Sequence, residues 1–266
     1  LGVLYQGSST PIVVDSNDLT GWTLTDCRAW LEYGSRTQTK PSVYLGLDGD
    51  FDYYVDATYG SDGNAGTSAG AAWASLKKIN DITHSTGVTN RVLIRSDTYD
   101  TADDWIEVSE NTETGAVLEL VFEPGCTMDG TAANAVASTN GFELAGNAVW
   151  TVRIYGNGLQ VNNYQVAGSD SPNGVGNRGG NIAYVYDVSV NDCEDSFSPH
   201  GDAELYLYDC DESGALKGAY SCVENSYLEA HRCTFRPENG SAPGVFAETA
   251  QAVLYDCVID PVVSAV

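Results

Sequence analysis

Two neighbouring carboxylates and a histidine are the residues of this sequence best suited to catalysis. Glu194 and Asp195 are adjacent, and His200 follows shortly after them. Glycoside hydrolysis needs two carboxyl groups, one acting as acid and the other as base or nucleophile. These three residues are therefore the catalytic candidates. The alternative is a turn with solvated acids, because adjacent acidic pairs are expected in a chain with 37 Asp and Glu.

A glycine-rich acidic loop over residues 56–67 offers oxygen atoms that could hold a cation. Asp56, Asp62 and Asn64 carry the side-chain oxygens that calcium takes as ligands. Calcium at these residues is the one cofactor that the sequence suggests. The spacing does not match the helix–loop–helix calcium motif. The alternative is that the acids and glycines only shape a tight turn.

Tyrosines gather in the last third of the chain and could contact sugars. Aromatic rings stack on the apolar faces of sugars, and a phenol hydroxyl also forms hydrogen bonds. Tyr220 and Tyr227 lie near expected turns and are the freer to be exposed. We therefore predict a carbohydrate-binding set formed by Tyr220, Tyr227, Asp209 and Asp256.

The elements that position these residues repeat along the chain. The segments 205–210, 227–233 and 252–257 align with one another, and 184–188 is an earlier member. A period of about 20–25 residues is typical of a stacked solenoid, in which each turn buries its apolar face only against its neighbours. The repeat predicts an inward column formed by Val188, Cys210, Cys233 and Cys257.

Strand alternation then sets the direction of the remaining side chains. The residues before that column should line the outer surface: Asp187, Asp209, Arg232 and Asp256. Arg232 would form a cross-rung ion pair with an aspartate, or act as the base of a lyase. Tyr206 and Tyr208 share the parity of Cys210, which favours an inward position for both rings.

The N-terminal part of the chain differs from these repeats. Residues 1–50 are expected to form an irregular leader or attachment segment, and residues 51–266 the solenoid. Within 71–82, Ala72, Leu76, Ile79 and Ile82 fall at helical spacing. We predict a short amphipathic helix there that covers the open N-terminal edge of the first coil.

The composition limits the partners. The net charge of −25 disfavours nucleic acid and anionic membranes, and it also disfavours acidic polysaccharides unless a cation bridges them. There is no membrane-spanning apolar run, and Leu1 opens no recognisable signal peptide. The seven cysteines are odd in number and form no CxxC pair, so buried free thiols are expected rather than zinc ligands.

The segment 54–67, followed by 72–76, resembles the entry motif of right-handed parallel β-helix proteins of the pectate-lyase-like superfamily. The resemblance covers residues 53–260. It implies an all-β, right-handed parallel β-helix (a β-solenoid) opened by a strand, a polar loop and a capping helix. The motif occurs in polysaccharide lyases, glycosidases and trimeric phage tail spikes and fibres, so it does not choose among activities.

The polygalacturonase motifs of that superfamily are not intact in this chain. We therefore expect a virion-associated tail spike or fibre module, homotrimeric or bound to other virion proteins, that binds a host-surface polysaccharide. The alternatives are a secreted carbohydrate-active enzyme, either a polysaccharide lyase or a glycoside hydrolase, and a purely structural extracellular filament or surface protein. The expected location is the virion tail or the extracellular space.

Overall fold

The computed structural model describes residues 2–5, 11–14, 45–108, 113–132, 140–145, 149–165, 173–215, 218–236 and 246–259. The chain divides into two compact units, residues 1–44 and 45–266. In the first unit, β1 (Gly2–Tyr5) pairs antiparallel with β2 (Pro11–Val14). Residues 15–44 of the predicted leader lie outside the described residues.

The second unit is all-β, and every strand pairing described in it is parallel. The first sheet contains β3 (Tyr53–Val55), β4 (Thr89–Ile94), β7 (Val117–Phe122), β10 (Thr151–Asn162), β12 (Ile182–Asn191), β14 (Glu204–Tyr208), β17 (Tyr227–His231) and β20 (Gln251–Tyr255). The second sheet is joined to the first through β10 and β12. Its other strands are β5 (Thr98–Tyr99), β8 (Thr127–Asp129), β15 (Asp211–Ser213), β18 (Thr234–Arg236) and β21 (Val258–Ile259). The third contains β6 (Ile106–Val108), β9 (Phe142–Leu144), β11 (Asn173–Arg178), β13 (Asp195–His200), β16 (Gly218–Val223) and β19 (Phe246–Glu248).

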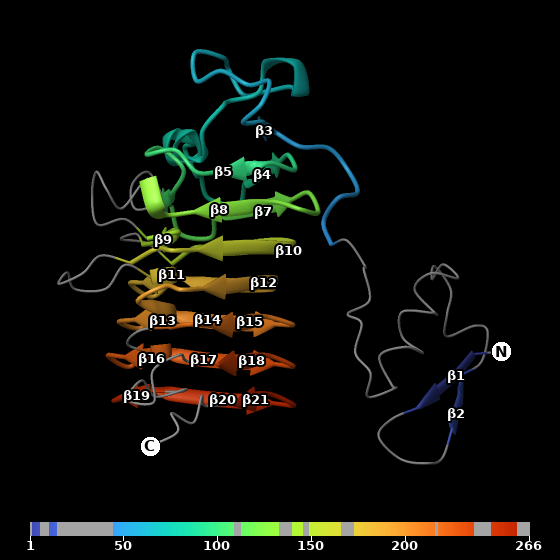
Figure 1. The fold of residues 1–266 in the computed structure, drawn as a ribbon, viewed down its shortest axis with the longest axis vertical. Helices are drawn as coiled ribbons and strands as arrows, with labels where there is room; N and C mark the ends of the chain where they lie inside the picture. The colour runs from blue at the N-terminus through green and yellow to red at the C-terminus, as the bar shows by residue number, and fades with distance from the viewer. Residues whose placement is uncertain are drawn as a thin grey trace. The chain divides into compact units, whose positions relative to one another are not determined.

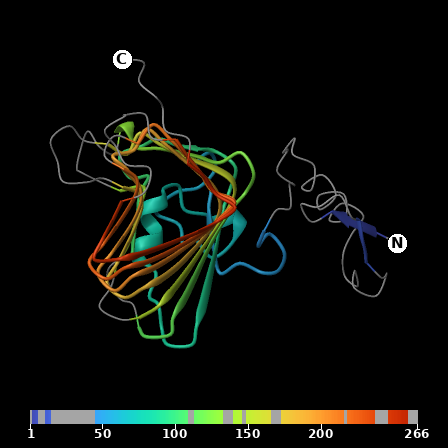
Figure 2. The ribbon, with the colours of Figure 1, turned by 90° about the horizontal axis from the view of Figure 1, so that it is seen from below.

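The chain visits the three sheets in turn and then returns to the first sheet one strand further along (Figure 1). The long strands β10 and β12 contribute their first halves to the first sheet and their second halves to the second. Seen along the stack, the strands superimpose into a closed outline (Figure 2). This arrangement is consistent with a β-solenoid, as the period of the sequence predicted.

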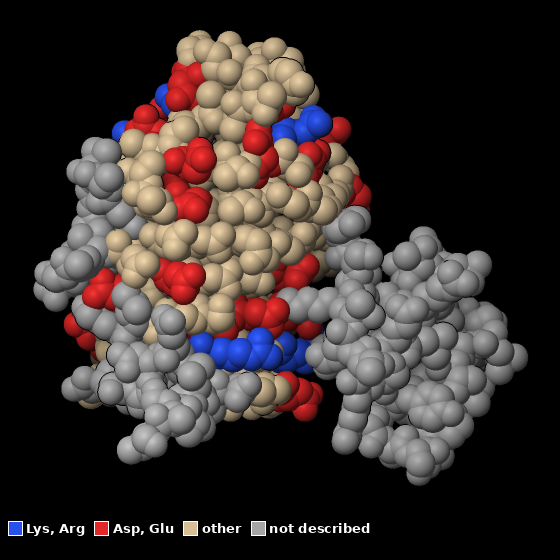
Figure 3. All heavy atoms as spheres, in the orientation of Figure 1, with Lys and Arg blue, Asp and Glu red and all other residues tan. Residues whose placement is uncertain are grey.

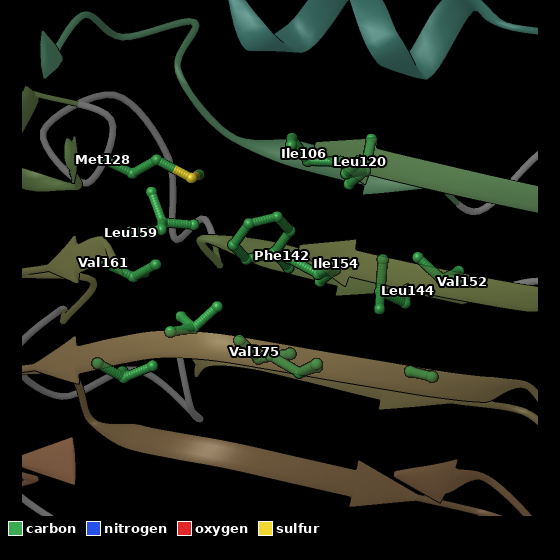
Figure 4. Close-up of a cluster of buried hydrophobic side chains, with 14 of the residues drawn as sticks. Ile106, Leu120, Met128, Phe142, Leu144, Val152, Ile154, Leu159, Val161 and Val175 are labelled. Carbon is green, nitrogen blue, oxygen red and sulfur yellow. The ribbon is translucent and has the colours of Figure 1, made fainter. Parts of the chain in front are cut away.

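The core is a set of inward columns. Because successive side chains of a strand point to opposite faces, every second residue enters the interior. Leu120, Ile154, Val185 and Leu207 occupy equivalent register positions and are fully buried. Figure 4 shows such aliphatic and aromatic side chains facing one another between the sheets.

A single residue in the left-handed conformation turns the chain from the first sheet to the second. The φ angles are 52° at Asp187, 56° at Asp209, 53° at Arg232 and 53° at Asp256. Aspartate tolerates this region better than most residues, and Arg232 occupies it without that advantage. The inward column is confirmed: Val188, Cys210, Cys233 and Cys257 follow these corners, and the first three are buried.

The prediction of inward rings at Tyr206 and Tyr208 is wrong. Both are partly exposed, whereas Leu205 and Leu207 of the same strand β14 are fully buried. Parity can be counted only along extended backbone. The corner at Asp209 interrupts the alternation, so Tyr208 and Cys210 lie on opposite faces although they are two positions apart in the chain.

The structure does not contain the single amphipathic helix predicted over 71–82. It has two short 3-10 segments instead, η1 (Ala69–Ala71) and η2 (Leu76–Asp81). Trp73 between them forms a parallel bridge with Val55, which keeps the intervening backbone extended. Leu76 and Ile79 are nevertheless fully buried. Among the described residues, no helix is long and apolar enough to span a membrane.

Candidate functional site

A column of stacked rings runs along the outer face of the first sheet. Tyr155, Tyr186, Tyr208, His231 and Tyr255 occupy the same register position on successive strands. Their ring centroids are 5.2, 5.0, 5.0 and 4.6 Å apart in that order, and the interplanar angles are 14°, 12°, 8° and 16°. We call these five residues the ring column. Their equal register follows from the parallel stacking of the coils.

The ring column presents hydroxyl groups rather than ring faces. Each inner ring covers the faces of its neighbours, so the flat surfaces that stack on sugars are occupied within the column. Within the described part of the chain, the hydroxyls of Tyr155, Tyr186, Tyr208 and Tyr255 have no hydrogen-bond partner. Burial raises the pKa of Tyr186 to about 12, with neighbouring tyrosines adding to the effect, so its phenol is neutral at physiological pH.

A second row of polar side chains lies beside the ring column on β14 and β17. The Tyr206 hydroxyl donates to Glu204 (2.8 Å), and the Tyr227 hydroxyl donates to Glu229 (2.6 Å). His231 Nε2 is 2.6 Å from the other oxygen of Glu229. The hydrogen bonds from Tyr227 and His231 lower the pKa of Glu229, which keeps it a carboxylate. The two carboxylates therefore offer acceptor oxygens on the same face as the phenol hydroxyls.

This face is acidic. Over the described ranges 182–191, 204–209, 227–232 and 251–256, five carboxylates accompany one guanidinium, that of Arg232. Arg232 pairs in a bidentate manner with Asp209, at 2.8 and 2.7 Å, so the predicted cross-rung ion pair is confirmed. In the view of Figure 3, acidic side chains are spread over the described surface and basic ones gather in a few places.

The upper end of the ring column is covered by the protein's own chain. A Cβ added at Gly46 would lie 2.9 Å from the Tyr155 ring and 3.2 Å from Val121, so the backbone there rests directly on both. Asn157 holds Leu45 through hydrogen bonds of 2.6 and 3.0 Å. The guanidinium of Arg91 donates to the carbonyls of Gly46, Asp48 and Asp50. We call residues 45–50 the covering segment.

The predicted carbohydrate-binding residues are not all on this face. Tyr227 lies in the second row, Asp209 is held by Arg232, and Asp256 is exposed at the last corner. Tyr220 belongs to β16 of the third sheet, and its side chain lies outside the described residues. The ring column itself was not predicted from the sequence. The signal that could have found it was the recurrence of Tyr or His directly before each corner.

The predicted catalytic residues do not converge. Asp195 begins β13 and His200 ends it, which separates them by about 16 Å of extended strand. Glu194 and Asp195 are buried. Ser198 Oγ is 2.6 Å from His200 Nε2, and burial, together with Arg178, lowers the pKa of His200. A catalytic role for these residues stays a prediction, without support from their spacing.

A different pair of carboxylates lies side by side on the third sheet. Glu107 and Glu143 face each other on β6 and β9, and Arg178 contacts Glu143 at 2.8 Å. Burial and the charge of Glu107 raise the pKa of Glu143, against the opposing effect of Arg178. The amide of Asn173 is fully buried nearby, and neither of its polar atoms has a partner in the described part of the chain. Nothing in the sequence around Glu107 and Glu143 indicated this pairing.

The predicted calcium ligands are used by the loop itself. Asp62 accepts hydrogen bonds from the backbone N–H groups of Ala74 and Ser75 and from the Ser75 hydroxyl. These bonds outweigh the effect of burial and lower the pKa of Asp62. The Asp56 carboxylate accepts hydrogen bonds from two backbone N–H groups that follow it in the chain. The side-chain amide of Asn64 donates a hydrogen bond to the carbonyl of Ala72. No cluster of three or more His, Cys, Asp or Glu in the described ranges could hold a metal ion.

Comparison with known proteins gives one short similarity. A stretch of 60 residues, 23% of this chain, is 43% identical to a protein named lacto-N-biosidase from Bifidobacterium longum subsp. longum. The matched stretch amounts to 4% of the length of that protein. No family model matches the sequence, and no solved structure matches it.

Proposed function

We propose that this chain is a right-handed parallel β-helix of the pectate-lyase-like type that binds a polysaccharide through the outer face of its first sheet. The right hand follows from the strong preference of parallel crossover connections for that hand. The observation that carries the function is the row of phenol hydroxyls along successive coils, flanked by the carboxylates Glu204 and Glu229. Hydroxyls and carboxylates are suited to hydrogen-bonding a hydroxyl-rich polymer.

The biological setting that we propose is a virion tail spike or fibre, assembled as a homotrimer. Its basis is the resemblance of residues 54–67 to the entry motif found in such proteins. Light scattering tests the trimer directly, because a monomer at micromolar concentration would contradict it. A purely structural filament would share the solenoid and bind no glycan.

A glycan panel tests the binding proposal. The panel should contain neutral and acidic polysaccharides and compare the wild type with Tyr208→Ala and Tyr59→Ala. Tyr59 is 86% exposed and lies in the loop after β3, so it is a matched exposed tyrosine outside the ring column. We expect binding by the wild type and by Tyr59→Ala, and loss of binding in Tyr208→Ala. Equal binding by all three proteins, or by none, would contradict the proposal.

A second candidate function is glycoside hydrolysis on the third sheet. The observation that favours it is the pair Glu107 and Glu143, which stand one strand spacing apart with Arg178 beside them. A retaining glycosidase uses two carboxyl groups about 5–5.5 Å apart. The short similarity to a protein named as a biosidase points to the same class. Reducing-end release that is abolished in Glu143→Gln, but not in Asp195→Asn, would support this candidate.

A further inference from the structure

The exposed part of the ring column has a fixed length and a fixed period. Below the covering segment, the column offers four positions, Tyr186, Tyr208, His231 and Tyr255, one on each of the strands β12, β14, β17 and β20. Their rings repeat every 4.6–5.0 Å along the stack. Tyr155 is excluded, because Gly46 rests on its ring. A ligand that follows the column therefore meets one polar group per coil over four coils.

The polar groups of this face favour some classes of polymer over others as ligands. The ring faces are covered by their neighbours in the column, so recognition must use hydroxyl groups and ring edges rather than stacking. The hydroxyls of Tyr186 and Tyr208 have no partner in the described part of the chain and are free to donate and accept. The carboxylates beside them accept hydrogen bonds from hydroxyl groups and repel anions. A neutral, hydroxyl-rich polymer satisfies both conditions.

The spacing of the rings along the stack also favours a particular shape of glycan. A glycan of equatorially linked pyranoses is extended, and the length of each sugar along the chain is close to the spacing of neighbouring strands, about 4.8 Å. A chain lying along the stack would therefore place each sugar at the same height on successive coils. An α-linked glycan that coils back on itself loses this match after one or two sugars.

From these features we infer that the face binds a neutral, extended, equatorially linked glycan that lies parallel to the solenoid axis, with one sugar per coil and four sugars in contact. Tyr186 and Tyr208 hydrogen-bond to successive sugars through their hydroxyls. Glu204 and Glu229 bind hydroxyl groups on one side of the glycan chain. This inference deepens the proposed function, which concerns polysaccharide binding by the same face, and it rests on it.

A length series tests the inference. Dissociation constants should be measured by calorimetry for β-1,4-linked cello-oligosaccharides from the disaccharide to the octasaccharide. Malto-oligosaccharides and oligogalacturonates of matched length serve as the coiled and acidic comparisons. We expect the affinity for the cello-series to rise up to the tetrasaccharide and then to remain constant. The other two series should bind at least tenfold more weakly.

Single-atom variants test the contact. Tyr186→Phe and Tyr208→Phe remove one hydroxyl and keep the stacked ring, so the column should remain folded. Each should weaken tetrasaccharide binding about threefold to tenfold, the value of one hydrogen bond. Tyr59→Phe, outside the column, should have no effect. Unchanged affinity in both column variants would overturn the inference.

The outcomes separate this inference from the proposed function. Binding of polysaccharide with no dependence on length, or with a preference for oligogalacturonates, would contradict the axial neutral glycan and leave polysaccharide binding intact. Absence of binding to any member of the panel and of the series would contradict both.

Discussion

The outer face of the first sheet has an upper and a lower part that differ in what contacts them. On β4, β7 and β10, Arg91 and Arg153 flank Glu119 in an ion ladder, with distances of 2.9 and 3.1 Å, and the covering segment lies over the sheet. On β12, β14, β17 and β20, the same face carries the stacked rings of the ring column beside the carboxylates Glu204 and Glu229. The upper part of the face is thus covered by the protein's own chain. Among the described residues, the lower part is open to a ligand.

In this fold, the outward side chains can therefore differ between coils without a change in the inward side chains that hold the stack together. The inward columns continue through both parts, and their residues are mostly aliphatic, aromatic or small. The register is continuous from β4 to β20. Only the outward residues change, so their chemistry can vary from coil to coil while the stack is preserved.

The largest expected effect comes from truncating the shared core. Leu120→Ala in the upper part and Leu207→Ala in the lower part should each reduce the free energy of unfolding by about 2–5 kcal/mol, because both side chains are fully buried. Urea denaturation measures this loss. Tyr206→Ala, one residue away on the outer face, should cost about 1 kcal/mol or less. Equal losses in Leu207→Ala and Tyr206→Ala would contradict the corner at Asp209.

Acid should destabilise the upper part through His84. This fully buried histidine packs against Trp150, with ring centroids 5.4 Å apart, and burial lowers its pKa to about 4. In the unfolded chain its pKa is about 6.5. The folded state therefore loses stability as the pH falls from about 6.5 to about 4, by up to about 3 kcal/mol. Urea titrations across this range measure the loss.

The matched variant for this prediction is His84→Leu. It should remove the part of the acid dependence that falls between pH 6.5 and pH 4. Parallel loss of stability in the wild type and in His84→Leu over this range would show that other groups are responsible.

Release of the covering segment should convert part of the closed surface into open surface. Arg91→Met removes the donors to three carbonyls of that segment and should cost about 1–3 kcal/mol. Hydrogen exchange at residues 45–50 should accelerate. Arg95→Met is the control, because its described ion pair is with Glu123 alone. If the glycan follows the ring column, Arg91→Met should also extend the affinity plateau by one sugar, as Tyr155 becomes available.

The smallest effect is expected at the exposed ion pair. Asp209→Asn should reduce the free energy of unfolding by about 1 kcal/mol or less, because an exposed pair is screened by solvent. The difference from the wild type should shrink further when salt is added. A loss above about 2 kcal/mol that is insensitive to salt would mean that the corner depends on the carboxylate itself.

Much of the scaffold could be predicted from the sequence. The recurring segments that end in Val188, Cys210, Cys233 and Cys257 gave the strand positions and the inward column, because stacking requires equal register. The directions of Tyr206 and Tyr208 could not be predicted. They depend on the φ angle at Asp209, which the residue type permits and does not dictate.

The candidate site was less predictable than the scaffold. Sequence reasoning chose Glu194 and Asp195 because they are adjacent in the chain, yet the side-by-side carboxylates are Glu107 and Glu143. Adjacent residues of a strand point to opposite faces, whereas residues one coil apart point to the same face. In a solenoid, the residues of a site come from neighbouring coils. The strand register must therefore be known before these residues can be identified.

The most direct test of the account is an NMR titration of the protein carrying carbon-13 in its tyrosine rings, with a cello-tetraose ligand. If the ring column binds the glycan, shifts should change at Tyr186, Tyr208 and Tyr255, and none should change at the buried Tyr99 and Tyr164. Saturable binding that perturbs none of the ring-column tyrosines would contradict it.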